Sequence, residues 1–156
     1  MGRDDVTMPS AERTALSAPI WRRPVRLAEL NASLRDSLAA HLGMQIVEIG
    51  PDYLVASMPV DRRTKQSRGL LNGGASAALA ETVGGMAAEL CLDSGHCVGL
   101  DINTNHLRRV SDGLVFARAE PVHVGRTTQV WNIHTTDEQG RAVALSRLTL
   151  AVLNRS

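Results

Sequence analysis

Apolar and polar residues recur along this chain with two different periods, which divide it into helical and extended segments. Leucines every three or four positions predict one amphipathic helix over residues 27–42, ended by Gly43. These leucines are Leu27, Leu30, Leu34, Leu38 and Leu42. Residues 44–60 instead alternate with a period of two on both sides of Gly50-Pro51-Asp52, which predicts a bent strand or a hairpin.

The second half of the chain predicts a long helix followed by a sheet. Residues 75–91 are rich in Ala, Leu, Met and Glu, and one face of this central helix carries a core stripe. Four strands are predicted after it, at residues 97–109, 114–122, 127–136 and 142–153, and the short turns between them indicate an antiparallel meander. The order of elements predicts an α+β domain in which one antiparallel sheet packs against the long helix.

Composition favours one small globular domain. The 156 residues are 44% hydrophobic and 21% charged, enough for a single core, and the net charge of +1 comes from scattered residues that offer no footprint for nucleic acid. Residues 1–19 are polar and lack periodicity, so we expect a flexible leader there and the folded domain in 20–156.

Neither a disulfide framework nor a metal site is expected, because Cys91 and Cys97 are too few and the five histidines lack zinc-ligand spacing. The N-terminal residues have no apolar run of a secretion signal, and no stretch is long enough to span a bilayer. We therefore expect a soluble, cytoplasmic protein that binds no membrane.

Glu81 lies on a second face of the predicted central helix, surrounded by residues with little or no side chain. Its neighbours three and four positions away are Ala77, Ala78, Gly84 and Gly85. A substrate can approach such a carboxylate closely, and a glutamate base can take a proton from water. The alternative is an ordinary solvated glutamate, which is what most helical glutamates are.

Asn72-Gly73-Gly74 precedes this helix and offers backbone amides at its N-terminus. Free amides there point toward developing negative charge, which is the outline of an oxyanion hole. The structural alternative is that Asn72 simply caps the helix.

Several motifs together are more specific than either feature alone. They include Met58–Gln66, the run Gly69-Leu70-Leu71-Asn72-Gly73-Gly74-Ala75-Ser76, Leu79-Ala80-Glu81, Val98–Arg108, His123-Val124-Gly125-Arg126, Gln129-Val130-Trp131 and Ser146–Thr149. In these motifs the chain resembles, from Trp21 to Leu153, the hotdog-fold thioesterases that act on 1,4-dihydroxy-2-naphthoyl-CoA, an intermediate of menaquinone biosynthesis, and on related aryl thioesters.

The resemblance implies a hotdog fold and an acyl-CoA thioester hydrolase that needs no cofactor, since coenzyme A is part of the substrate. It implies Glu81 as nucleophile or general base, the Gly73 amide as the donor to the thioester carbonyl, and Gln66 as the residue that places substrate or water. It further implies Thr82 near the attacking water. The implied substrate-binding residues are Gly74, Met86 and His106 and, for the CoA arm, Arg108, Arg109, His123, Gly125, Arg126 and Thr127.

One position departs from the family pattern. Asn72 stands where these thioesterases have a histidine that donates toward the thioester oxygen, and an asparagine amide donates over a shorter reach. Asn72 is therefore either a variant with the same role or an altered site. A non-catalytic module that binds acyl-CoA or acyl-carrier protein is the alternative function, and a hotdog dehydratase fits less well because it needs a histidine paired with an acid.

A homo-oligomer is also expected. One sheet on one helix leaves strand edges exposed, and such edges are usually paired or covered. The resemblance implies a dimer or homotetramer with active sites at the subunit interface, in which His106 serves the partner's site.

Overall fold

The computed structural model describes residues 18–153, and the expected leader therefore lies, except for its last two residues, outside the described residues. Three helices are present in this part: α1 (Leu27–Ser33), α2 (Leu38–His41) and α3 (Gly73–Leu90). Within it, no helix is both long enough and apolar enough to cross a bilayer.

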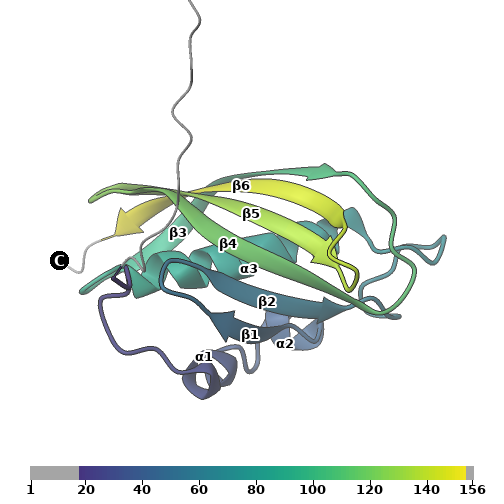
Figure 1. Ribbon diagram of the computed structural model, residues 1–156, viewed down its shortest axis with the longest axis horizontal. Coiled ribbons are helices and arrows are strands. Elements are labelled where there is room, and N and C mark those ends of the chain that lie inside the picture. Colours follow the sequence, from purple (N-terminus) through teal and green to yellow (C-terminus); the bar gives the residue numbers. More distant parts are fainter. Residues whose placement is uncertain (1–17, 154–156) are drawn as a thin grey trace, which may run out of the picture.

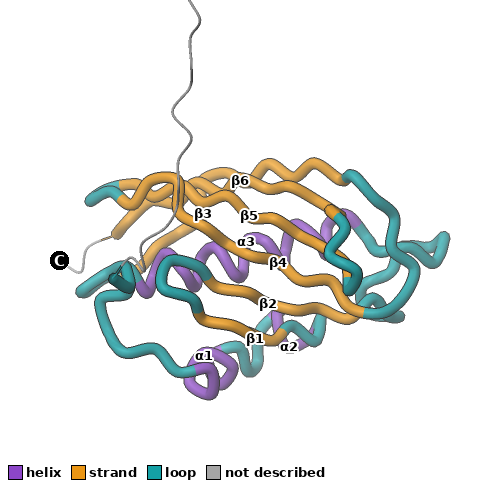
Figure 2. The backbone as a smooth tube through the Cα atoms, viewed as in Figure 1, coloured by secondary structure: helices purple, strands orange, loops and turns teal. Residues whose placement is uncertain are grey.

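Six strands form one antiparallel sheet, β1 (Gln45–Ile49), β2 (Leu54–Pro59), β3 (His96–His106), β4 (Leu114–Val124), β5 (Thr128–Asp137) and β6 (Ala142–Leu153). Their spatial order is β1-β2-β4-β5-β6-β3, and the sheet curves around α3, which lies against one of its faces (Figures 1 and 2). The expected α+β architecture, a sheet wrapped around a long helix, is confirmed.

The single helix predicted over residues 27–42 is wrong, because the chain breaks it into α1 and α2. Asp36 adopts a positive φ of 56°, which a helix cannot contain, and the Ser37 side chain then accepts a hydrogen bond from the Ala40 amide to begin a new helix. The leucine stripe ends at the same break, since Leu34 is buried but Leu38 is 64% exposed.

The four-strand meander is confirmed for β4, β5 and β6 but wrong for β3. That strand pairs with β6, from His96 opposite Leu153 to His106 opposite Ala144. In a meander β3 would pair with β4, but β2 occupies that edge of β4. The connection from β3 to β4 therefore crosses the sheet. The consequence is that β3 forms one free edge of the sheet.

Close packing fixes α3 against the sheet. Gly84 lies so near β6 that a Cβ atom there would come within 2.7 Å of Leu148, so the first glycine of the Gly84-Gly85 pair serves helix packing. One turn further along the helix the fully buried Gln129 donates to the Ala88 carbonyl and accepts from the Trp131 indole. These contacts hold the C-terminal half of α3 against the sheet.

Candidate active site

The N-terminus of α3 is built around Asn72. Its side-chain oxygen accepts a hydrogen bond from the Gly74 amide at 2.7 Å, and its own amide donates to the Thr64 carbonyl at 2.8 Å. Asn72 does cap the helix, the structural alternative weighed for it, and α3 begins at Gly73, two residues before the predicted start. The Gly73 amide forms no hydrogen bond within residues 18–153, so this donor is free.

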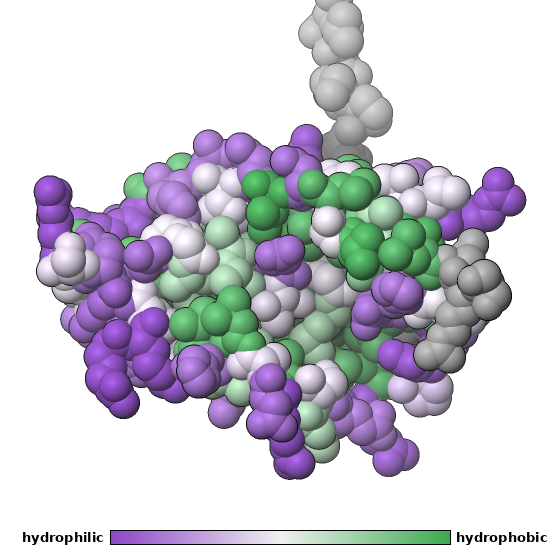
Figure 3. Space-filling view, turned by 180° about the vertical axis from the view of Figure 1, so that it is seen from behind, coloured by the Kyte–Doolittle hydropathy of each residue, from purple (hydrophilic) through white to green (hydrophobic). Residues whose placement is uncertain are grey.

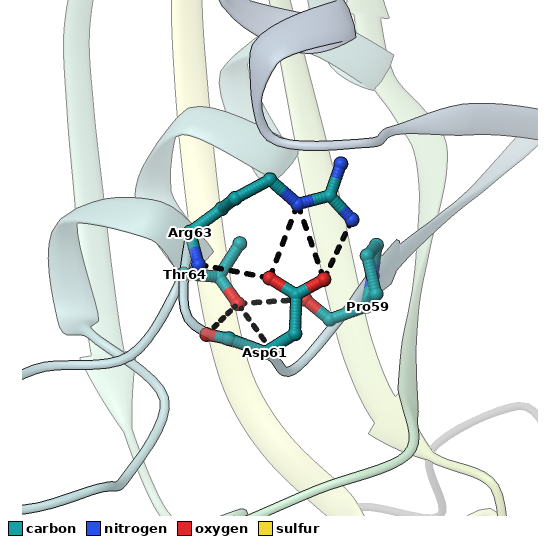
Figure 4. Close-up of polar contacts among 4 residues, drawn as sticks. All are labelled: Pro59, Asp61, Arg63 and Thr64. Carbon is teal, nitrogen blue, oxygen red and sulfur yellow. Dashed lines mark hydrogen bonds and ion pairs between the residues drawn. The ribbon is translucent and has the colours of Figure 1, made fainter.

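A compact turn presents Gln66 to this helix end. The buried Thr64 hydroxyl donates to the Pro59 carbonyl at 2.7 Å, and the Asp61 carboxylate accepts from the backbone and guanidinium of Arg63 (Figure 4). The Arg63 hydrogen bonds lower the pKa of Asp61 to about 2, so this ion pair stays charged throughout the neutral range. The Gln66 side-chain oxygen accepts from the Arg68 amide, which leaves its NH₂ group as a donor.

Gln66, Gly73 and His106 meet in one cavity of about 400 Å³. A Cβ atom on Gly73 would lie 2.7 Å from Nε2 of His106, which places the imidazole directly over the helix N-terminus. The cavity is completed by Leu70, Leu71, Ser76, Leu107, Arg108, Arg109 and Val143. Three predicted site residues and two of the three arginines of the CoA-binding set are thus brought together.

The structure does not bring Glu81 to this cavity within one chain. Glu81 follows Gly73 by eight residues, about 12 Å along a helix. Its carboxylate is exposed on the side of α3 that borders β3, where Oε1 lies 3.0 Å from the place a Cβ atom of Gly99 would take. Thr82 beside it is half-buried, and a Cβ atom on Gly85 would meet open space.

His106 lies over Gly73 of its own chain, because β3 runs alongside α3 and ends where the helix begins. Its role in the partner's site stays a prediction.

The CoA-binding set is split between the two ends of α3. Residues 124–126 line a cavity of about 360 Å³ with Cys91 and Ser94 at the C-terminal end of the helix, and His123 and Thr127 flank them. Arg108 and Arg109 lie at the N-terminal end, about 27 Å away along an 18-residue helix, so one chain does not bring the whole set together. Met86 lines a third cavity, with Leu30 and Glu89.

Neither cysteine offers a competing nucleophile. Burial raises the pKa of both the Cys91 and the Cys97 thiol to about 11, so each stays protonated, and unreactive as a thiolate, at neutral pH.

Sequence reasoning missed two residues beside the predicted ones. Gly99 gives the Glu81 carboxylate room against β3, and Ser76 lines the cavity one turn after Gly73. The position of Ser76, three residues after Gly73 on the predicted helix, could have shown that it lies near the Gly73 amide. The contact of Gly99 with Glu81 depends on the order of the strands, which the sequence does not show.

A long helix held by a curved antiparallel sheet is the architecture of the hotdog fold. Residues 68–144 match the family described as Thioesterase superfamily. The chain is 50% identical over 135 residues to the proofreading thioesterase EntH of Cronobacter turicensis, covering 86% of this chain and 98% of the relative. The chain belongs to the thioesterase superfamily.

Solved structures agree with this assignment. A thioesterase of Haemophilus influenzae has a TM-score of 0.85 at 48% identity, covering 86% of this chain and 95% of that one. A mutant thioesterase of Pseudomonas aeruginosa has a TM-score of 0.86 at 45% identity, covering 87% and 99%. Thioester hydrolysis is therefore the activity that its family supports for this chain.

Proposed function

We propose that this chain hydrolyses an acyl-CoA, with an aromatic acyl group preferred, at sites shared between two subunits. The observation that carries the proposal is the free Gly73 amide, which opens into a cavity with Gln66 and His106. The aromatic preference rests on the motifs that resemble aryl-CoA thioesterases.

The free edge of the sheet provides the route to a shared site. Two copies related by a two-fold axis can join their β3 strands only in antiparallel order, which continues the sheet across the dimer. Leu100 on this strand is 64% exposed and Val98 is partly exposed, and apolar residues gather on the helix side of the molecule among charged ones (Figure 3). Pairing about the middle of β3 moves the Glu81 of one chain, beside Gly99, toward the His106 end of the other.

The same pairing reunites the CoA-binding set. Arg108 and Arg109 follow the C-terminal end of β3, which would meet the partner's N-terminal end at His96. Next to that end lies the cavity lined by Gly125 and Arg126. Guanidinium groups and turn amides suit the phosphates of coenzyme A.

The reaction follows from these positions. Glu81 takes a proton from water, the resulting hydroxide attacks the thioester carbonyl carbon, and the oxygen that becomes negative accepts a hydrogen bond from Gly73. The carbon–sulfur bond then breaks, and the departing thiolate takes the proton from Glu81, giving a carboxylic acid and free CoA. In the alternative route, Glu81 itself attacks, the thiolate leaves, and water hydrolyses the anhydride.

Release of free thiol from a panel of aromatic and aliphatic acyl-CoAs tests the proposal. We expect turnover of aryl-CoA esters, with kcat/KM at least about 10-fold above that for aliphatic esters of similar size, a difference of about 1.4 kcal/mol in transition-state binding. Tight binding without thiol release would support the alternative of a module that binds acyl-CoA or acyl-carrier protein.

Replacing Asn72 with histidine tests the departure from the family pattern. We expect turnover to rise, because an imidazole reaches further into the cavity than an asparagine amide already held by Gly74. Loss of the cap should lower the free energy of unfolding by about 1 kcal/mol. Kinetics and urea unfolding of Asn72→His and Asn72→Ala separate these effects, since both lose the cap and only one gains the donor. Equal turnover in the two variants would contradict the prediction.

A further inference from the structure

Ser76 is a buried hydroxyl without a partner in the protein. It is 2% exposed, yet its side chain forms no hydrogen bond with any residue in 18–153. Thr135 also has an unpartnered buried hydroxyl, but its oxygen is fully enclosed, whereas Ser76 lines the cavity that holds Gly73 and His106. Because its oxygen faces the cavity rather than the enclosed core, the Ser76 hydroxyl is available to donate to an occupant of that cavity.

The position of Ser76 on α3 directs it toward the Gly73 amide. Ser76 lies three residues after Gly73, and side chains of a helix tilt toward its N-terminus, so its hydroxyl leans over the turn that Gly73 begins. The backbone amide of Ser76 already donates to the Asn72 carbonyl at 3.2 Å. Hydroxyl and free amide therefore face the same end of the cavity.

We propose that the Ser76 hydroxyl is the second donor to the thioester oxygen, beside the Gly73 amide. This inference rests on the proposed function. Asn72 is poorly placed for that task because its side-chain oxygen is fixed by the Gly74 amide and the residue is exposed. A tetrahedral intermediate carries a full negative charge on this oxygen, so a second donor stabilises it more than it stabilises the uncharged ester.

Ser76→Ala separates a catalytic role from a structural one. We expect kcat to fall about 10- to 100-fold while KM for the acyl-CoA changes less than about 2-fold, the pattern of a contact made in the transition state. The midpoint of thermal unfolding should stay equal or rise by about 2 °C, because alanine is the better helix former and no protein hydrogen bond is lost.

Ser146→Ala is the matched control. That serine is also buried, but its hydroxyl is hydrogen-bonded to Thr104 at 2.9 Å, so its loss should lower the unfolding midpoint and leave kcat unchanged.

The outcomes separate this inference from the proposed function. An unchanged kcat in Ser76→Ala, together with a large loss in a Glu81 variant, overturns the role of Ser76 and leaves the proposed function standing. A lower unfolding midpoint with a proportionate loss of active protein also overturns it. Inactivity of the unaltered protein toward every thioester overturns both.

Discussion

Glu81→Gln should lower the rate of thiol release from the preferred acyl-CoA by at least about 100-fold. The substitution keeps the size of the side chain and its place against Gly99, but an amide can neither take a proton from water nor attack the thioester. Because the loss concerns the chemical step, kcat should fall and KM should change little. Steady-state kinetics with a thiol reagent measure both constants.

Glu89→Gln is the matched control for this prediction. Glu89 lies on the same helix two turns further on and is also exposed, so the exchange removes the same charge without touching the proposed reacting atoms. Its kcat should remain within about 2-fold of the unaltered protein. Equal rates in Glu81→Gln and the unaltered protein would show that the carboxylate is not the base.

Local chemistry made α3 and its cap predictable from the sequence. Asn-Gly-Gly before an alanine-rich run specifies a helix start without help from the sheet. The helix cap and the oxyanion hole, the two interpretations weighed for this segment, both depend on that start. The strands were also placed to within a few residues, since glycine and charged turn residues separate them clearly.

The errors concern features that the hydrophobic pattern does not report. The break at Asp36 was hidden by an unbroken leucine period, because spacing alone does not report a positive φ. The place of β3 next to β6 depends on β2 having taken the edge of β4, which is a property of the whole sheet. The separation of Arg108 from the loop around Arg126 follows from that order.

The candidate site is also not assembled within one chain. The motifs correctly placed Gly73 and Glu81 on one helix, and eight residues of helix separate them by about 12 Å. Residues on different elements, such as Gln66 and His106, do converge on Gly73. The proposed pairing of two chains is what would bring a carboxylate of one α3 to the amide at the start of the other.

Gly73→Pro should be the second variant with a large loss, of at least about 100-fold in kcat, because proline removes the amide hydrogen proposed to bind the thioester oxygen. The helix itself should tolerate the change. Proline is favoured at the first helical position, and Asn72 already has the extended backbone (φ −72°, ψ 134°) that the residue before proline requires.

Gly73→Ala isolates the amide, since it adds the same Cβ atom against His106 but keeps the donor. The imidazole lies at the end of an exposed side chain and can shift, so this variant should retain most of its activity. A similar loss in the alanine and proline variants would mean that the added carbon, rather than the missing hydrogen, is responsible.

Mixed dimers of Glu81→Gln and Gly73→Pro chains then test the shared site. If each site takes Gly73 from one chain and Glu81 from the other, a mixed dimer has one site with both defects and one with neither. It should therefore recover about half the turnover of the unaltered dimer, although both parent variants are nearly inactive. A site built within one chain would carry one defect in each half, and purified mixed dimers would then stay as inactive as their parents.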